Sequence, residues 1–223
     1  MSHSLHPYLN TVTHGDCIAA LRALPDESVD LVLTDPPYLV RYRDRNGRSI
    51  LNDDNCRWIF PAFFEMYRVL KPNSLCVSFY GWPHVDRFMT AWRECGFTPV
   101  SHLTWVKPYV SKVGFTQGRH ECAYLLAKGR PCKPLLPPAD VLDWEFSGNA
   151  SHPNQKPVLS LVPLIEAYSK PDDVVLDPFA GSGSTGIAAL SCQRRFILIE
   201  KDARYAQAAK ERIREYAELV GAA

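Results

Sequence analysis

A run of apolar residues that stops at two prolines constrains the fold of this chain more than any other stretch. The run covers residues 29–34 and is followed by Asp35-Pro36-Pro37-Tyr38. A largely apolar run of this length is typical of a strand in a parallel sheet covered on both faces. Proline has a fixed φ and no N–H, so the corner should be stiff and should keep carbonyl groups that no ladder uses. Ligands bind at the carboxyl ends of such strands, although Tyr38 could also be a simple rim residue beside a strand end.

Strand and helix patterns alternate on both sides of an irregular middle section. This alternation predicts an α/β fold with one parallel-type sheet, completed by two separated pieces of chain. The expected strands cover residues 11–16, 29–34, 74–80, 100–106, 122–127, 173–176 and 196–199. The expected helices cover residues 17–24, 58–70, 85–95, 158–169, 183–192 and 202–220.

The 223 residues fit a single domain with an inserted lobe. Residues 108–149 are rich in Gly and Pro and form the expected lobe, while residues 39–57 are polar and without period, as in an exposed mobile loop. No apolar run is long enough to cross a membrane, and the seven cysteines are scattered without Cys-x-x-Cys spacing. A reduced, cytoplasmic protein without a metal site is therefore expected.

The net charge of +1 hides two basic patches. The first holds Arg41, Arg43, Arg45 and Arg48 against one Asp. The second runs from residue 107 to residue 133 and holds six basic residues against one Glu. A solvated face would explain either patch alone.

A second motif follows the strand expected near residue 175. Asp177-Pro178-Phe179-Ala180-Gly181-Ser182-Gly183-Ser184-Thr185 has the form of a strand end, a tight turn and a helix start. Glycines let a ligand approach the backbone, and N–H groups at a helix N-terminus suit an anionic group, although many such turns only permit tight packing. Glu200 lies about twenty residues further on, where an acid would bind a ribose diol, or would simply cap the next helix. The Gly spacing also fits a dinucleotide turn, but the Asp-Pro-Phe lead-in does not.

Together the two motifs resemble those of the S-adenosylmethionine-dependent DNA amino-methyltransferases, which methylate N6 of adenine or N4 of cytosine. Asp-Pro-Pro-Tyr precedes the cofactor turn by about 140 residues, as in the circularly permuted beta class of this family. His152-Pro153-Asn154-Gln155-Lys156-Pro157 and Arg119-His120-Glu121 also resemble that class. The resemblance covers nearly the whole chain and implies a circularly permuted, Rossmann-like methyltransferase sheet.

The resemblance implies roles for individual residues. Asp35, Pro36, Pro37 and Tyr38 would form the catalytic corner, with Tyr38 stacked on a flipped base. S-adenosylmethionine would be the cofactor. Its expected contacts are Asp16, Cys17, Lys156, Asp177, Phe179, Gly181, Ser182, Gly183, Ser184 and Glu200.

DNA is the implied partner, and the two basic patches are candidates for its phosphate contacts. The expected DNA-binding residues are Arg41, Arg43, Arg45, Arg48, Lys107, Lys112 and Arg119. Residues 108–149 would form a small target-recognition lobe, which predicts a short or degenerate recognition sequence. Relatives of this class are often dimers, which suggests a homodimer, and a cognate restriction enzyme is a further candidate partner. The sequence establishes neither.

Asp35 favours adenine over cytosine, because relatives that methylate N4 of cytosine more often carry Ser at this position. N4-cytosine methylation on the same scaffold is the nearest alternative. A catalytically silent DNA-binding subunit is a third reading, against which the intact Asp35, Tyr38, Gly181 and Glu200 argue.

Overall fold

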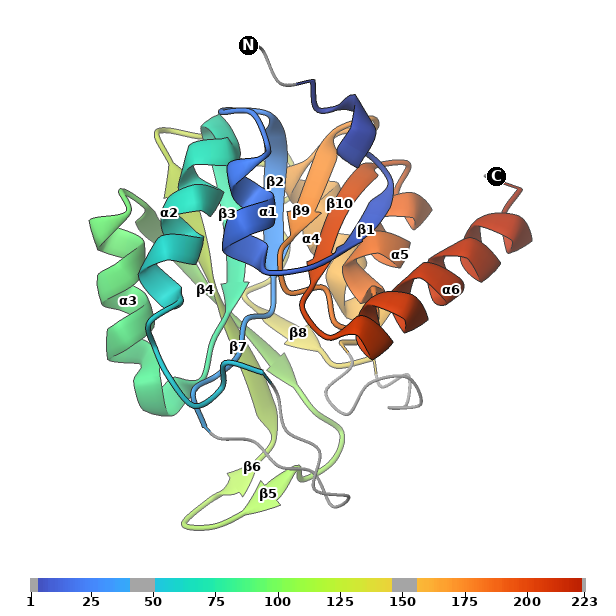
Figure 1. Ribbon diagram of the computed structural model, residues 1–223. Coiled ribbons are helices and arrows are strands. Elements are labelled where there is room, and N and C mark those ends of the chain that lie inside the picture. The colour runs from blue at the N-terminus through green and yellow to red at the C-terminus, as the bar shows by residue number, and fades with distance from the viewer. Residues whose placement is uncertain (1–3, 41–50, 146–155, 222–223) are drawn as a thin grey trace.

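The computed structural model describes residues 4–40, 51–145 and 156–221. An eight-stranded sheet runs through the molecule in the order β1-β10-β9-β2-β3-β7-β4-β8 (Figure 1). Within the described residues the 18 elements include six α-helices, so the α/β expectation is confirmed. None of the described helices is long and apolar enough to cross a membrane.

Five strands on one side of the sheet are parallel to one another. The late strands β9 and β10 lie between the early strands β1 and β2 (Figure 1), so two separated pieces of chain complete one sheet, as expected. The bounds are β1 Thr11–His14, β2 Val29–Thr34, β3 Leu70–Phe79, β9 Val174–Asp177 and β10 Arg195–Glu200.

The other side of the sheet contains an antiparallel insertion. Strand β7 (His120–Lys128) lies between β3 and β4 (Thr98–Val106) and is antiparallel to both. The short edge strand β8 (Val141–Asp143) continues the sheet parallel to β4. Strands β5 (Lys112–Val113) and β6 (Gln117–Gly118) form a separate hairpin. Of the strands in residues 108–149, two therefore belong to the main sheet, and β5 and β6 project from it.

Helices cover the sheet on both faces. Helices α1 (Cys17–Arg22), α2 (Ile59–Val69) and α3 (Val85–Glu94) share one core cluster, and α4 (Val158–Tyr168), α5 (Ser184–Ser191) and α6 (Ala203–Leu219) share the other. Two short 3-10 helices, η1 (His6–Tyr8) and η2 (Trp82–His84), complete the described elements. Strand β2 contributes Leu31 and Leu33 to one cluster and Val32 to the other, which explains why these three consecutive residues are all apolar.

Strand β3 begins earlier than its sequence predicts. The helix expected over residues 58–70 and the strand expected from residue 74 leave Lys71-Pro72-Asn73 between them, where the proline favours a helix end. Leu70, however, already pairs with Val29 of β2. The next pairs are Leu31 with Leu75 and Val32 with Cys76, so the intervening residues of β3 form a bulge. Asn73, at φ 59°, takes up the bend. Residues 71–73, whose sequence is typical of a helix end, therefore form a bulge within a strand.

Candidate functional site

The two sequence motifs meet at the carboxyl ends of neighbouring strands. Strands β2 and β9 are parallel and paired through Leu31–Val175 and Val32–Leu176. After β9 the chain crosses to β10, and after β2 it crosses to β3 on the other side, so the connections diverge at this point. A cavity of about 650 Å³ opens there, where open α/β sheets bind ligands.

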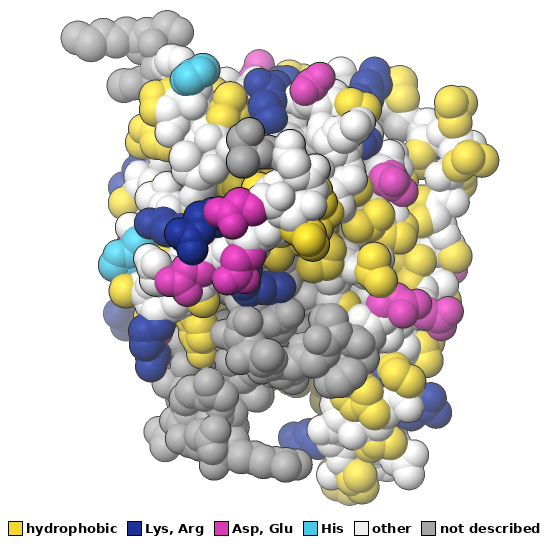
Figure 2. All heavy atoms as spheres, turned by 90° about the vertical axis from the view of Figure 1, so that its right-hand side faces the viewer, with side chains coloured by type: hydrophobic (Ala, Val, Ile, Leu, Met, Phe, Trp, Pro, Cys, Tyr) yellow, Lys and Arg dark blue, Asp and Glu magenta, His cyan; other side chains and the backbone are white. Residues whose placement is uncertain are grey.

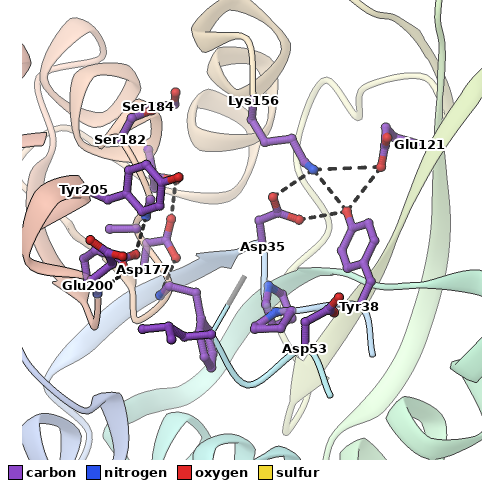
Figure 3. A pocket seen from close by; sticks show the side chains of 18 of the residues that line it. Asp35, Tyr38, Asp53, Glu121, Lys156, Asp177, Ser182, Ser184, Glu200 and Tyr205 are labelled. Carbon is purple, nitrogen blue, oxygen red and sulfur yellow. Dashed lines mark hydrogen bonds and ion pairs between the residues drawn. The ribbon is translucent and has the colours of Figure 1, made fainter. Parts of the chain in front are cut away.

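A buried lysine holds the catalytic corner that was expected after β2 (Figure 3). Lys156 Nζ lies 2.8 Å from Asp35 Oδ2 and donates a hydrogen bond to Tyr38 Oη at 3.0 Å. The Tyr38 hydroxyl is also 2.8 Å from Asp35 Oδ1, to which it donates. Lys156 was expected to contact the cofactor, but in this structure its ammonium is directed to Asp35 and Tyr38.

A second acid and a second lysine complete this cluster. Glu121 Oε2 lies 3.2 Å from the Tyr38 hydroxyl and 3.9 Å from Lys156 Nζ, while its Oε1 is paired with Lys107. The four charged side chains are two carboxylates and two ammonium groups, so their formal charges cancel. The rings of Phe79 and Trp144 lie 4.7 and 5.8 Å from Lys156 Nζ. Such rings favour a desolvated cation.

Burial and pairing set the protonation of the cluster. Burial lowers the pKa of Lys156, but Asp35 and Glu121 outweigh it and the net pKa is raised. Burial raises the pKa of Asp35, and the Lys156 ammonium opposes that rise. For Glu121, the two lysines outweigh burial and lower the pKa. Burial and the neighbouring acids raise the pKa of Tyr38 well above its usual value, so it stays a hydrogen-bond donor.

A different environment surrounds Asp177 at the end of β9. Its Oδ1 accepts the Phe179 N–H at 3.0 Å, and its Oδ2 accepts the Thr185 hydroxyl at 2.7 Å. The side chain is buried, and among the described residues none forms an ion pair with it. Burial raises the pKa of Asp177 to about 7, with the Asp35 charge adding to the rise.

Glu200 ties the small-residue turn to the next helix. Its Oε2 accepts the Gly181 N–H at 2.8 Å and its Oε1 accepts the Asp202 N–H at 2.7 Å. Gly181 has a φ of 52°, a conformation that glycine adopts without strain. Glu200 thus supports the turn and lines the cavity, while the side chain of Asp202 is the one that caps α6. The ribose contact stays a prediction.

The cavity brings together most of the residues expected to bind the cofactor. Those that line it are Cys17, Lys156, Asp177, Phe179, Gly181, Ser182, Ser184 and Glu200. Asp16 is not among them, because it caps α1 and lies 3.3 Å from Lys201 Nζ, itself a lining residue. Gly183 is also absent from the lining. A Cβ at Gly183 would lie 3.0 Å from the Ala209 Cβ, so this glycine allows α6 to pack closely.

The described residues among those expected to bind DNA lie in two different places. Lys112 and Arg119 are exposed on and beside the β5–β6 hairpin. Lys107 is buried in the cavity wall and paired with Glu121, which differs from the expected phosphate contact. Arg41, Arg43, Arg45 and Arg48 lie outside the described residues, as do residues 152–155 of the motif before α4.

Glu121 and Trp144 are site residues to which the sequence assigned no role. Strand pairing places Glu121 opposite Trp105, and the Lys107 N–H donates to the Arg119 carbonyl, which continues the pairing of β4 with β7. The resemblance of Arg119-His120-Glu121 to a family motif was the available signal for Glu121. For Trp144 the sequence offers no comparable signal.

The polar groups of the cavity suit a neutral hydrogen-bonding ligand beside Asp35 and a cationic ligand beside Asp177.

Among residues 4–40, 51–145 and 156–221, no group of three His, Cys, Asp or Glu side chains is placed to hold a metal ion. The loop expected at residues 39–57 reaches the cavity with its described ends, where Asp53 Oδ1 accepts the Val40 N–H at 3.2 Å.

Known proteins resemble this chain in both sequence and architecture. A family model described as DNA methylase (N6_N4_Mtase) matches residues 29–211. The chain is 55% identical over 199 residues to YubD of Escherichia coli (strain K12), which is named as a methylase, covering 89% of this chain and 88% of YubD. It is 28% identical over 256 residues to the type II methyltransferase M.HinfI of Haemophilus influenzae, covering 96% of this chain and 71% of M.HinfI. The crystal structure of the M1.HpyAVI–SAM complex superposes with a TM-score of 0.74 at 25% identity, covering 91% of this chain and 98% of that one.

Proposed function

Because this chain belongs to the DNA methylase family, whose model matches most of its length, we propose that it methylates the N6 amine of adenine in DNA, with S-adenosylmethionine as the cofactor. The observation that carries the proposal is the position of Asp35. Its carboxylate opens onto the same cavity as Asp177 and Glu200, from the end of the neighbouring strand. One cavity can therefore hold a methyl donor and an amine acceptor side by side.

The residues of the β9 side suit S-adenosylmethionine, a molecule with cationic groups and a carboxylate. Asp177 is a buried carboxylate without an ion-pair partner among the described residues, as a site for a cation requires. The buried Ser184 hydroxyl has no hydrogen-bond partner among the described residues and stands at the first turn of α5, where a carboxylate would be favoured. Phe179 and Glu200 would contact the adenosine. When bound, S-adenosylmethionine supplies the electrophilic methyl group.

On the β2 side, Asp35 would activate the amine by orientation. The lone pair of an exocyclic amine is delocalised into its ring, so the amine is a poor nucleophile. The Asp35 carboxylate and the Pro36 carbonyl would accept its two hydrogens and favour a pyramidal nitrogen with the lone pair aimed at the methyl group. Lys156 fixes Asp35 for this role from the side. After transfer, Asp35 would accept the proton that the methylated amine loses.

Tyr38 would stack on the flipped base and offset part of the cost of removing it from the duplex. Its hydroxyl lies between Asp35 and Glu121, so the ring is held at the wall of the cavity rather than exposed to solvent. No covalent enzyme intermediate is needed in this mechanism.

The choice of adenine rests on Asp35, and N4 of cytosine is the alternative. The same donor and acceptor geometry serves either amine, so the identity of the modified nucleoside decides between them.

We further propose that the basic residues 41–48 and the hairpin contact DNA phosphates, and that residues 108–149 form the recognition lobe. A lobe of about forty residues supports a short or degenerate target sequence. A homodimer, a partner restriction enzyme and a cytoplasmic location remain proposals.

Transfer of labelled methyl from S-adenosylmethionine to unmethylated DNA tests the proposal. We expect label in N6-methyladenine after nuclease digestion, and its loss in Asp35→Ala. Label in N4-methylcytosine would establish the alternative. If the wild-type protein transfers no label to DNA, it is a catalytically silent subunit. Full activity of Asp35→Ala would contradict the assigned mechanism. Sequencing of methylated DNA from a methylation-free host would give the target site, and one long unique site would contradict the small-lobe prediction.

A further inference from the structure

The β5–β6 hairpin carries an apolar tip that is exposed among the described residues. Phe115 at the tip is fully exposed, and Val113 beside it is 74% exposed. Most large apolar side chains of the described chain are buried in the two core clusters. Other apolar side chains, such as Leu135, are just as exposed, so exposure alone does not assign a role to Phe115. The position of this ring on an arm beside the cavity is what distinguishes it.

The hairpin is an ordered arm that presents this tip. The Ser111 N–H donates to the Gly118 carbonyl at 2.8 Å, and the Gly114 N–H donates to the Thr116 carbonyl at 3.0 Å. Below them, the Lys107 N–H donates to the Arg119 carbonyl and links the arm to the β4–β7 ladder. These bonds fix the direction of the arm, so the tip can be inserted without a large ordering cost.

The arm is suited to a polyanion. Residues 108–120 contain no Asp or Glu, and Lys112 and Arg119 are exposed along them. Figure 1 shows the hairpin as the lowest element of the molecule, and the lowest described side chains in Figure 2 are yellow and dark blue together. Apolar and basic groups are combined in this way where proteins insert a wedge into DNA.

The base of the arm is the rim of the cavity. Tyr109, Val110 and Ser111 line the same cavity as Asp35 and Tyr38. A duplex that places a base beside Asp35 must therefore run past the hairpin.

We propose that Phe115 inserts into double-stranded DNA next to the target base and takes its place in the stack, with Lys112 and Arg119 on the flanking phosphates. This inference rests on the proposed function, because it assumes that a base enters the cavity. Insertion offsets the unstacking that base flipping requires. Insertion of Phe115 should therefore increase activity only on a substrate in which the target base is paired and stacked.

The test compares two substrates that contain the methylated sequence found with the wild-type protein. One is a fully paired duplex, and the other has an abasic site opposite the target base, which weakens the hold on that base. We expect Phe115→Ala to lower kcat/KM at least about tenfold on the paired duplex and less than about threefold on the second substrate. Phe115→Trp should retain activity on both. Thermal unfolding of the variants should match that of the wild type, because the ring is exposed.

Leu135→Ala is the matched control. Leu135 is also a fully exposed apolar residue, it follows the end of β7 where Lys128 pairs with Ser74 of β3, and it is not among the residues that line the cavity. This control should equal the wild type on both substrates. Equal activity of Phe115→Ala and wild type on the paired duplex, or an equal loss on both substrates, would overturn the wedge. If the wild type itself transfers no methyl to either substrate, the proposed function fails first, and the two failures are thus distinguished.

Discussion

Asp35 and Asp177 stand at the carboxyl ends of adjacent parallel strands, yet their surroundings differ in charge. Asp35 lies 2.8 Å from the Lys156 ammonium, within a cluster whose formal charges cancel. Asp177 accepts hydrogen bonds from a backbone N–H and a hydroxyl, and no described cation pairs with it. The same residue type therefore has two different electrostatic roles in one cavity.

The difference indicates what each side of the cavity binds. A carboxylate whose charge is already balanced can orient a neutral amine without attracting a cation. A carboxylate without a counter-ion attracts one, and its pKa of about 7 shows how strongly burial opposes its charge in the free protein. We therefore expect the methyl donor, which is cationic, on the Asp177 side and the acceptor on the Asp35 side.

The largest effect is expected from Asp35→Asn. The amide keeps the shape of the side chain but replaces one acceptor with a donor, so the amine of the base loses its orientation. We expect kcat to fall by about 10³-fold, as for other removed groups that stabilise a transition state. Single-turnover methyl transfer measures this loss.

Cofactor binding provides the control for Asp35→Asn. Calorimetric titration with S-adenosylmethionine should give a Kd within about threefold of the wild type, because the charge beside Asp177 is unchanged. An equal loss in Kd and kcat would show that the two aspartates do not have separate roles.

Asp177→Asn should give the reverse result. The substitution keeps both hydrogen bonds possible but removes the charge that a cationic ligand would meet. Loss of a charge-assisted interaction corresponds to roughly 1.5–3 kcal/mol, and we expect the Kd for S-adenosylmethionine to rise about 10- to 100-fold at pH 8. With saturating cofactor, kcat should recover to within several-fold. A Kd equal to that of the wild type would remove Asp177 from the cofactor site.

The pH dependence of binding should follow Asp177. Its pKa is raised to about 7 in the free protein, so the carboxyl is mostly neutral below that pH and mostly ionised above it. Because a cation prefers the ionised form, affinity should fall as pH decreases through 7, by about 20-fold between pH 7.5 and pH 5.5. The same titration with Asp177→Asn should be nearly flat. A flat wild-type profile would contradict the assignment.

Local signals predicted the parts of the site that lie within one strand–turn unit. The local sequence determines the backbone at the proline stop after residue 34 and at the small-residue turn after Asp177. Both corners and Glu200 could therefore be placed at the cavity from the sequence. The role of Gly183 was less accessible, because the same residue suits a ligand turn and close packing against Ala209. Its packing partner lies on another helix.

The rest of the site depends on pairings between distant segments. Glu121 reaches Tyr38 only because β7 is inserted antiparallel between β3 and β4, a topology that no local pattern specifies. The burial of Lys107 follows from the same insertion. Strand β8 has three residues, too few to show a period, and the bulge in β3 uses residues that normally end a helix.

The smallest effect is expected for Glu121→Gln, which alters the Asp35 cluster from a distance. Gln keeps a hydrogen-bond acceptor for the Tyr38 hydroxyl but leaves the buried Lys107 ammonium without its anion. Because Lys156 remains on Asp35, we expect kcat to fall only about fivefold, a coupling of roughly 1 kcal/mol. The stability should fall by more, roughly 3 kcal/mol, because an unpaired buried charge remains. Denaturant unfolding measures the loss of stability, and steady-state kinetics measure the loss of kcat, so the two effects are separated.

The double variant Lys107→Met/Glu121→Gln sharpens this result. It removes both members of the pair, so the cluster returns to zero net charge and most of the lost stability should return. If kcat returns with it, Glu121 acts on Asp35 through charge balance. If stability returns and kcat does not, the negative charge of the acceptor that faces the Tyr38 hydroxyl is what matters, because Gln keeps an acceptor but a neutral one. Glu121 is then a positioning residue for the Tyr38 ring. Full activity of the single variant would show that the balance of the Asp35 cluster rests on Lys156 alone.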